Sequence, residues 1–205
     1  MVLQMNILIA CEFSGIVRDA FVKRGHYAVS CDLLPTEIPS IRHYQGDVRD
    51  ILYQEWDMLI AHPPCTYLTS AGNAHISKPG RAAKRDEAFN FFMELANVDI
   101  PKICIENPVG YVNSHWRKPD QIIHPYYFGD PKMKRTCLWL KGLPKLVYEP
   151  GKYPIPEPVY ISSGDTTKGK KIHWTESVGK TRGTGWMERS RTSKAIADAM
   201  AQQWG

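Results

Sequence analysis

One cysteine in this sequence of 205 residues has a setting that favours chemistry over packing. Cys65 follows Pro63 and Pro64 at the end of an apolar run, so two prolines fix the backbone that presents the thiol. A thiol near a cation or a helix N-terminus loses its proton more easily and becomes a nucleophile. Structural cysteines lie more often inside strands, as we expect of Cys104 and Cys137. A purely structural role for Cys65 stays open on this evidence.

Glu106 is the second residue with chemical potential. It directly follows the apolar run Lys102–Ile105 and precedes Asn107 and Pro108. We expect its carboxyl group to face the same edge of a sheet as Cys65. Partial burial at that position predicts a raised pKa, which would suit hydrogen bonding or proton transfer.

A turn containing Gly15 and the acidic residues Asp32 and Asp47 are consistent with a nucleoside cofactor. The glycine permits close approach of the ligand, and Asp32 can hold ribose hydroxyls. Asp47 is placed to accept a hydrogen bond from an exocyclic amine such as that of adenine. The sequence lacks a G-x-G-x-x-G motif, which argues against a dinucleotide. A helix-capping Asp47 and a solvated Asp32 are the alternatives.

The elements that must position these residues alternate between two patterns. Apolar runs predict strands at Met5–Cys11, Tyr27–Cys31, Asp57–Ala61 and Lys102–Ile105, and helical spacing predicts helices at Ile16–Arg24 and Arg85–Ala96. Unbroken apolar strands that alternate with helices indicate an α/β fold with a parallel sheet. Ligands of such sheets bind beyond the carboxyl ends of the strands, where the residues above fall.

The second half of the chain has a different composition. Many prolines argue against long helices after Tyr111, and a strand is predicted at Thr136–Leu140. Residues 163–191 are rich in Gly, Thr, Lys and Arg, which predicts a mobile loop. A closing helix is expected at 192–204, N-capped by Thr192 or Ser193.

The net charge of +5 is unevenly distributed. Residues 1–111 carry a net charge of −3, whereas residues 112–191 carry +8. This asymmetry indicates a polyanionic partner that contacts mainly the second half, with a solubilising surface as the alternative. We therefore expect a cofactor-binding and catalytic core over 1–111 and a basic region over 112–191. A helix over 192–205 would pack back on the core.

Composition excludes several classes of protein. Hydrophobic content of 43% and charged content of 23% are near globular averages. No apolar run approaches the roughly 20 residues of a membrane span, and the first residues lack the pattern of a signal peptide. The five cysteines show no disulfide framework, and no residue cluster has metal-ligand spacing. We expect a reduced, cytoplasmic protein (in the host cytoplasm if encoded by a phage) that binds neither a membrane nor a metal.

Together, these segments resemble the cytosine-C5 DNA methyltransferase family, and most closely its compact phage or prophage members. FSGIVRDAF is similar to the family's cofactor loop, SCD to its ribose acid and GDVRDI to its adenine-contacting segment. DMLIAHPPC is similar to the nucleophile motif and ICIENPVG to the Glu-Asn motif. These motifs occur in the family's order over residues 5–110, and KRTCLWLKG and TSKAIADAMAQQW extend the resemblance more loosely. PPC at the end of one strand together with EN at the end of the next is a specific signature of this family. Each of the other segments alone is not specific.

The resemblance implies a Rossmann-like, S-adenosylmethionine-dependent methyltransferase fold with a small basic, irregular insertion. It implies that Cys65 attacks C6 of a flipped cytosine while Glu106 holds N3 and the exocyclic amine. Arg135, or its neighbour Lys134, would supply a cation that steadies the base. The cofactor contacts would be Phe13, Ser14, Gly15, Asp32, Asp47 and Pro63. Contacts to double-stranded DNA would be Thr66, Ser70, Lys134, Lys170, Lys171 and Arg182.

The sequence departs from the family in the cofactor loop, where Ile16-Val17-Arg18 stands in place of a second glycine pair. One alternative is therefore a catalytically inactive, DNA-binding homologue. Another is a related methyltransferase that acts on a pyrimidine of RNA or a free nucleotide. A third is an amino methyltransferase acting on an exocyclic amine, although those enzymes place an aromatic residue where this chain has Cys65.

Overall fold

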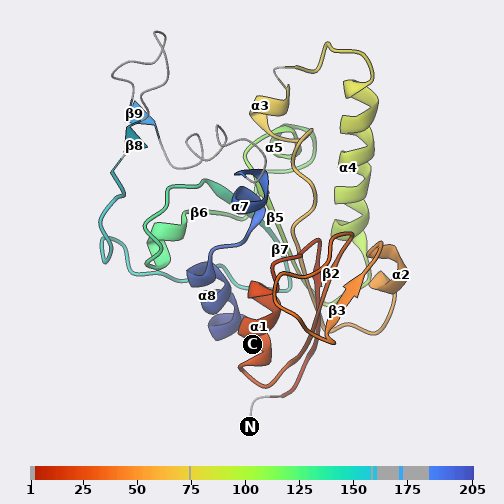
Figure 1. Ribbon diagram of the computed structural model, residues 1–205, viewed down its shortest axis with the longest axis vertical. Helices are drawn as coiled ribbons and strands as arrows, with labels where there is room; N and C mark the ends of the chain where they lie inside the picture. Colours follow the sequence, from red (N-terminus) through yellow and green to blue (C-terminus); the bar gives the residue numbers. More distant parts are fainter. Residues whose placement is uncertain (1–2, 74, 158, 161–170, 173–184) are drawn as a thin grey trace.

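A seven-stranded sheet forms the centre of the computed structural model, which describes residues 3–73, 75–157, 159–160, 171–172 and 185–205 (Figure 1). Its strands are β1 (Asn6–Ala10), β2 (Tyr27–Asp32), β3 (His43–Gln45), β4 (Met58–Ala61), β5 (Lys102–Pro108), β6 (Gln121–Ile123) and β7 (Thr136–Lys141). Their order is β3-β2-β1-β4-β5-β7-β6, and β7 runs in the direction opposite to the other six strands. This is the doubly wound Rossmann order with an antiparallel strand inserted between β5 and β6. The predicted α/β, Rossmann-like fold is confirmed.

Helices connect the strands and cover the sheet. They are α1 (Ile16–Val22), α2 (Arg49–Leu52), α3 (Ser70–Asn73), α4 (Arg81–Asn97), α5 (Tyr111–His115), the 3-10 helix η1 (Pro125–Phe128), α7 (Gly185–Ser190) and α8 (Lys194–Trp204). Two short strands, β8 (Val159–Tyr160) and β9 (Lys171–Ile172), pair with each other apart from the main sheet. Within the described ranges, no helix has the length and apolar character needed to cross a bilayer.

Both faces of the sheet are buried, which explains the unbroken apolar runs in the sequence. Successive side chains of β1, β4 and β5 point to opposite faces. One face packs Leu8, Leu59 and Ile103 against α4, and the other packs Ile9, Ile60 and Cys104 against α1 and α8. Figure 1 shows α4 on one side of the strands and the adjacent α1 and α8 on the other. The carboxyl ends of the parallel strands therefore remain uncovered by these two helical layers.

The second half of the chain differs from expectation in three places. β6 and β7 belong to the main sheet, so residues 121–141 of the expected basic region build the core of the fold. Gly185–Ser190 forms α7, where we expected part of a mobile loop. Ser193 is the N-cap residue of α8, but its hydroxyl donates a hydrogen bond to Asp130 and does not cap the helix.

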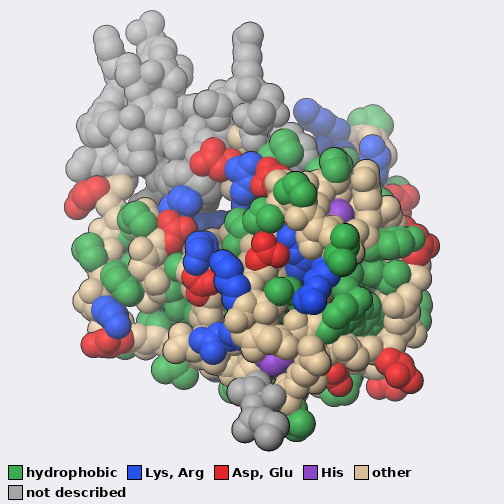
Figure 2. All heavy atoms as spheres, turned by 60° about the horizontal axis from the view of Figure 1, so that its bottom comes forward, with side chains coloured by type: hydrophobic (Ala, Val, Ile, Leu, Met, Phe, Trp, Pro, Cys, Tyr) green, Lys and Arg blue, Asp and Glu red, His purple; other side chains and the backbone are tan. Residues whose placement is uncertain are grey.

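The surface in Figure 2 carries charges of both signs. Lys and Arg side chains are interspersed with Asp and Glu over this face, and they do not gather into one patch.

Candidate active site

The backbone around Cys65 is held by three hydrogen bonds. The side-chain amide of Asn107 donates to the carbonyl of Pro63 over 2.9 Å, which ties the end of β4 to the end of β5. The carbonyl of Cys65 accepts the N–H groups of Leu68 and Thr69 at 2.9 and 3.0 Å. Cys65 therefore lies between a fixed strand end and a tight turn.

Glu106 comes from the neighbouring strand. β4 and β5 are parallel and in register, with Ala61 opposite Ile105, so their ends reach the same edge of the sheet. The Glu106 side chain is 13% exposed, and its Oε2 lies 3.3 Å from Nδ1 of His62. Its Oε1 is buried and has no hydrogen-bond partner within the described part of the chain. A buried carboxylate oxygen of this kind is open to a ligand.

Two cations act on this pair. The charge of Lys134 influences both Cys65 and Glu106, and the charge of Arg189 influences Cys65. Lys134 Nζ also donates to the carbonyl of Arg189 over 2.9 Å. Arg135 is exposed, so of the two adjacent candidates the structure brings Lys134 to the site.

The pKa of Glu106 is lowered, contrary to our expectation. Burial alone would raise this pKa, but the charge of Lys134 and the hydrogen bond and charge of His62 outweigh burial. The pKa of Cys65 is raised, first by burial and then by the negative charge of Glu106, with partial opposition from Lys134 and Arg189. In the absence of a ligand, the site therefore combines a carboxylate with a protonated thiol.

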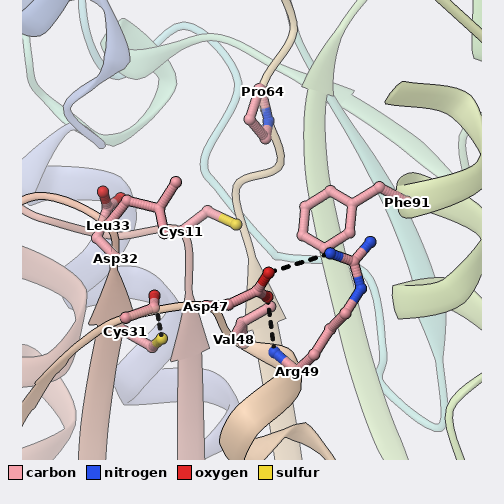
Figure 3. Close-up of a pocket in the computed structure, with 10 residues that line it drawn as sticks. Cys11, Cys31, Asp32, Leu33, Asp47, Val48, Arg49, Pro64 and Phe91 are labelled. Atoms are coloured by element: carbon pink, nitrogen blue, oxygen red, sulfur yellow. Dashed lines mark hydrogen bonds and ion pairs between the residues drawn. The ribbon is translucent and has the colours of Figure 1, made fainter. Parts of the chain in front are cut away.

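A pocket of about 190 Å³ lies beside these residues at the same edge of the sheet (Figure 3). Its lining consists of Cys11, Cys31, Asp32, Leu33, Gly46, Asp47, Val48, Arg49, Pro64 and Phe91. Figure 3 shows Asp32 and Leu33 on one side of the pocket and Phe91 on the opposite side. Apolar walls with carboxylates at the margin suit a ring system that carries hydroxyl or amine groups.

The two predicted acids of this pocket have different partners. Asp32 Oδ1 accepts the N–H of Leu34 over 2.9 Å, and burial raises the pKa of Asp32. Asp47 accepts the backbone N–H of Arg49 at 3.0 Å and its guanidinium at 3.1 Å. That guanidinium also lies over the ring of Phe91, 4.8 Å from its centroid. Asp47 thus bonds to the first turn of α2 and lines the pocket at the same time.

The expected cofactor loop has an unexpected form. Phe13 and Ser14 are buried, and the side chain of this segment that reaches the pocket is Cys11, which has a left-handed φ of 58°. Gly15 has a φ of 72°, and a Cβ atom there would come within 2.5 Å of Nη2 of Arg18. The fully buried Arg18 therefore fills the space behind the loop. None of Phe13, Ser14 and Gly15 lines the pocket described above.

The remaining residues predicted to contact cofactor or DNA lie in different parts of the structure. Pro63 is buried, and Pro64 lines the pocket in its place. Thr66 and Ser70 are exposed close to Cys65 in the chain, and the Ser70 hydroxyl donates to the carbonyl of Val109 over 3.2 Å. Lys171 falls in β9. Lys170 and Arg182 lie outside the described residues.

Sequence reasoning missed one contribution to the site, which we call the strap (residues 185–193). Arg191 pairs with both carboxylate oxygens of Glu37 at 2.7 and 2.6 Å. Thr192 Oγ1 lies 3.4 Å from Nδ1 of His62. With the bond from Lys134 to the Arg189 carbonyl, these contacts join the strap to three different loops at the edge of the sheet. No local pattern in the sequence predicts pairings over such separations.

The described ranges contain no group of three or more His, Cys, Asp or Glu residues able to hold a metal ion. The site therefore consists of a thiol, a carboxylate, an imidazole and two cations next to a pocket.

Comparisons with known proteins give weak likenesses. No protein-family model matches the chain, and no curated protein matches it. Among solved structures, the S. pombe Dnmt2 methyltransferase is 15% identical with a TM-score of 0.44, over 69% of this chain and 50% of its own length. The Entamoeba histolytica methyltransferase EhMeth is 15% identical with a TM-score of 0.45, over 75% of this chain and 58% of its own. The chain thus spans only half or somewhat more of these two proteins, and its fold class rests on its strand order.

Proposed function

We propose that this chain is an S-adenosylmethionine-dependent methyltransferase that modifies C5 of cytosine in DNA through Cys65. The observation that carries the proposal is the meeting of Cys65, Glu106 and Lys134 at one edge of the sheet, beside the pocket lined by Asp32 and Asp47. A thiol and a carboxylate at adjacent strand ends are the two groups that the C5 reaction needs.

The residues of the pocket fit the cofactor. Asp32 would hold the ribose hydroxyls, and Leu33, Val48 and Phe91 would enclose the adenine ring. Asp47 would accept a hydrogen bond from the exocyclic amine of adenine. This bond would either replace the bond between Asp47 and the Arg49 guanidinium or form in addition to it. Bound there, S-adenosylmethionine supplies a methyl group activated by a positively charged sulfur.

Cys65 and Glu106 act on the target base. C5 of cytosine is a poor nucleophile, and addition of the Cys65 thiolate to C6 converts the ring into an enamine whose C5 can accept a methyl group. The addition places electron density on N3, which takes a proton held between it and Oε1 of Glu106, an oxygen that has no partner among the described residues. Loss of the C5 proton then restores the double bond and releases Cys65.

Binding of the base also favours ionisation of the nucleophile. The negative charge of Glu106 raises the pKa of Cys65 in the ligand-free protein. When Glu106 is neutralised by a proton that base binding takes up from solvent between Oε1 and N3, that opposition disappears, and Lys134 and Arg189 favour the thiolate. The thiol would therefore become reactive mainly when a base occupies the site.

DNA is the proposed substrate because residues 112–191 carry a net charge of +8. A single phosphate does not require so many cations, whereas a polymer does. We expect the affinity for duplex DNA to fall steeply as the salt concentration rises. Each phosphate that the protein neutralises releases counterions and makes the affinity more sensitive to salt.

The test is methyl transfer from labelled S-adenosylmethionine to mixed-sequence duplex DNA and, separately, to RNA, with nucleosides resolved by mass after digestion. We expect label in 5-methylcytosine of DNA and its loss by a factor of about 10⁴ or more in Cys65→Ser, since nucleophiles of this kind are indispensable. Cys137→Ser is the matched control, because Cys137 is buried in β7. Label in a methylated exocyclic amine, or full activity of Cys65→Ser, would overturn the proposal.

A further inference from the structure

Another pocket lies among the residues that follow β6 and β7, and the proposed reaction does not use it. Its volume is about 300 Å³, against about 190 Å³ for the pocket beside Cys65. We call it the tyrosine pocket, because tyrosines form most of its walls. Its lining consists of Tyr126, Tyr127, Tyr148, Glu149, Pro150, Gly151, Tyr153 and Ile155. Aromatic walls with a few polar groups suit a flat ring that can both stack and form hydrogen bonds.

The tyrosine rings hold one another in fixed orientations. Tyr127 and Tyr148 stack with their centroids 4.4 Å apart and an interplanar angle of 14°, and Tyr126 meets Tyr127 edge to face at 4.7 Å. The ring of Tyr153 lies against Gly129, where a Cβ atom would come 3.0 Å from Cζ of Tyr153. Side chains that are already ordered lose little conformational entropy when a ligand binds.

The tyrosine pocket is open to solvent. Tyr153 is 38% exposed and Ile155 is 66% exposed, whereas Tyr126, Tyr127 and Tyr148 are half-buried. A group of large, partly exposed apolar side chains marks a binding surface more often than a core. Bases of an opened nucleic-acid strand stack on tyrosine rings largely irrespective of sequence.

The register of the sheet places the tyrosine pocket at the edge that carries Cys65 and Glu106. Thr136 of β7 lies opposite both Pro108 of β5 and Ile123 of β6. The chain after β6 therefore starts level with a residue two positions beyond Glu106. β5 and β6 are separated by two strand spacings, or about 10 Å. A nucleic-acid strand covers this distance in about three stacked nucleotides.

The strap connects the two sites. Asp130, which follows Gly129, accepts a hydrogen bond from the hydroxyl of Ser193 over 2.9 Å. η1, which contributes Tyr126 and Tyr127 to the pocket, also packs against α8 (Figure 1). The tyrosine pocket is thus fixed relative to the residues that act on the target base.

The charges favour a neutral ring in a polyanion as the ligand. All lining residues belong to the region 112–191, which has a net charge of +8. The one acidic residue of the lining, Glu149, pairs with Lys152 at 3.4 Å. The pocket therefore has no surplus negative charge with which to hold a cation such as a quaternary ammonium group.

We propose that the tyrosine pocket binds a nucleobase of the substrate strand, within about three nucleotides of the target cytosine. The inference rests on the proposed function. The bound base stacks on the tyrosine rings and holds the strand while the target base is turned out toward Cys65 and Glu106. Substrates that are unstacked beside the target cytosine are therefore preferred.

The first test is photo-crosslinking of the wild type to short single-stranded DNA that contains one cytosine and one 5-iodouracil. The iodouracil is moved one position at a time, and mass spectrometry of the digested complex identifies the side chain to which it is joined. We expect cross-links to Tyr126, Tyr148 or Tyr153 when the iodouracil lies within about three nucleotides of the cytosine. Cross-links confined to residues outside the tyrosine pocket, or no cross-links, would overturn the inference.

The second test compares affinities for the same DNA without iodine, measured by fluorescence anisotropy. Tyr153→Ala should bind about tenfold more weakly than the wild type, whereas Tyr153→Phe, which keeps the ring, should bind like the wild type. Tyr27→Ala is the matched control, because Tyr27 is 43% exposed and lies at the amino end of β2, at the opposite edge of the sheet. An abasic site beside the cytosine should weaken binding to the wild type by a similar factor and leave binding to Tyr153→Ala unchanged.

Equal affinities of Tyr153→Ala and Tyr27→Ala would contradict the inference. Loss of the cross-link when free nucleoside monophosphates are added at an equal concentration of bases would overturn the assignment to a strand. Neither readout requires methyl transfer. If the wild type forms no 5-methylcytosine, the proposed function fails, whereas cross-links to the tyrosine pocket still support a site for a base.

Discussion

The thiol of Cys65 lies within the electrostatic reach of Glu106, whose negative charge opposes ionisation of the thiol. Lys134 favours ionisation of both groups, and His62 favours that of Glu106. Glu106 is the group that ionises, because Lys134 and His62 outweigh the effect of burial on its pKa and because a carboxyl group has a lower intrinsic pKa than a thiol. At the scale of single residues, the surroundings of Cys65 therefore favour its protonated form.

Replacing Glu106 by Gln should make Cys65 more reactive toward small reagents, although it should abolish methyl transfer. Removal of the negative charge lowers the pKa of Cys65, so a larger fraction is thiolate at a given pH. The pH dependence of alkylation by iodoacetamide measures this pKa. We expect the midpoint to move to lower pH and the rate near neutral pH to rise by several-fold.

A double variant that also carries Cys65→Ser isolates the signal, because the other four cysteines remain present in it. Alkylation that is unchanged between the wild type and Glu106→Gln would contradict the coupling of the two groups.

At the scale of elements, Glu12 organises the loop between β1 and α1. It is buried, and its Oε1 accepts the N–H of Val17 at 2.7 Å and the hydroxyl of Ser14 at 3.0 Å. Its Oε2 accepts the N–H of Arg18 at 3.3 Å. Glu12 thus satisfies donors that the first turn of a helix leaves unpaired. The loop is anchored by its own carboxylate, and a phosphate is not required to order it.

Glu12→Ala should destabilise the protein by about 3 kcal/mol, because buried donors lose a charged acceptor. Ser14→Ala removes one of the three bonds and should cost about 1 kcal/mol. Urea unfolding followed by circular dichroism measures both losses. Equal stability of the two variants would mean that water replaces the carboxylate at the helix terminus.

The elements that sequence patterns predicted are those with long apolar runs. β1, β2, β4, β5 and β7 each bury at least half of their side chains, so their composition identifies them. β3 and β6 have three residues each and are partly exposed, so their pairing depends on neighbours that are distant in sequence. Short elements of this kind have little local signal.

The same limit applies to the site. Cys65 and Glu106 were predictable together because parallel neighbours end at one edge of a sheet. Whether Lys134 or Arg135 reaches the site depends on the direction in which each side chain points, which the sequence does not give. The contact of Thr192 with His62 joins residues 130 positions apart, so no local pattern predicts it. The lowered pKa of Glu106 could not be predicted, because burial alone points in the opposite direction.

At the scale of the whole molecule, the strap joins parts of the site that the sheet alone does not connect. Arg191 reaches Glu37 in the loop after β2, whose N–H bonds to the carbonyl of Phe13 beside the pocket. Ser193 reaches Asp130 after η1, on the far side of Cys65 and Glu106 in the strand order. The strap therefore spans the edge of the sheet from the cofactor side to the side of β6.

Arg191→Ala should impair activity more than stability. The Arg191–Glu37 pair is partly exposed, so its loss should cost about 1 kcal/mol or less. Release of the strap should nevertheless displace Arg189 and Thr192, and single-turnover methyl transfer should fall several-fold. Lys194→Ala is the matched control, because it removes an exposed ion pair with Asp198 inside α8. Equal activity of the two variants would contradict a role for the strap.

The position of the strap in the chain also affects when the site is completed. All seven strands of the main sheet precede residue 142, whereas the strap begins at residue 185. The strands and the segments that carry Cys65 and Glu106 are therefore synthesised before Arg189, Thr192 and α8, which buries one face of the sheet. During that interval the thiol lacks one of the two cations that favour its ionisation. The site is thus completed only when the C-terminal residues of the chain have been synthesised.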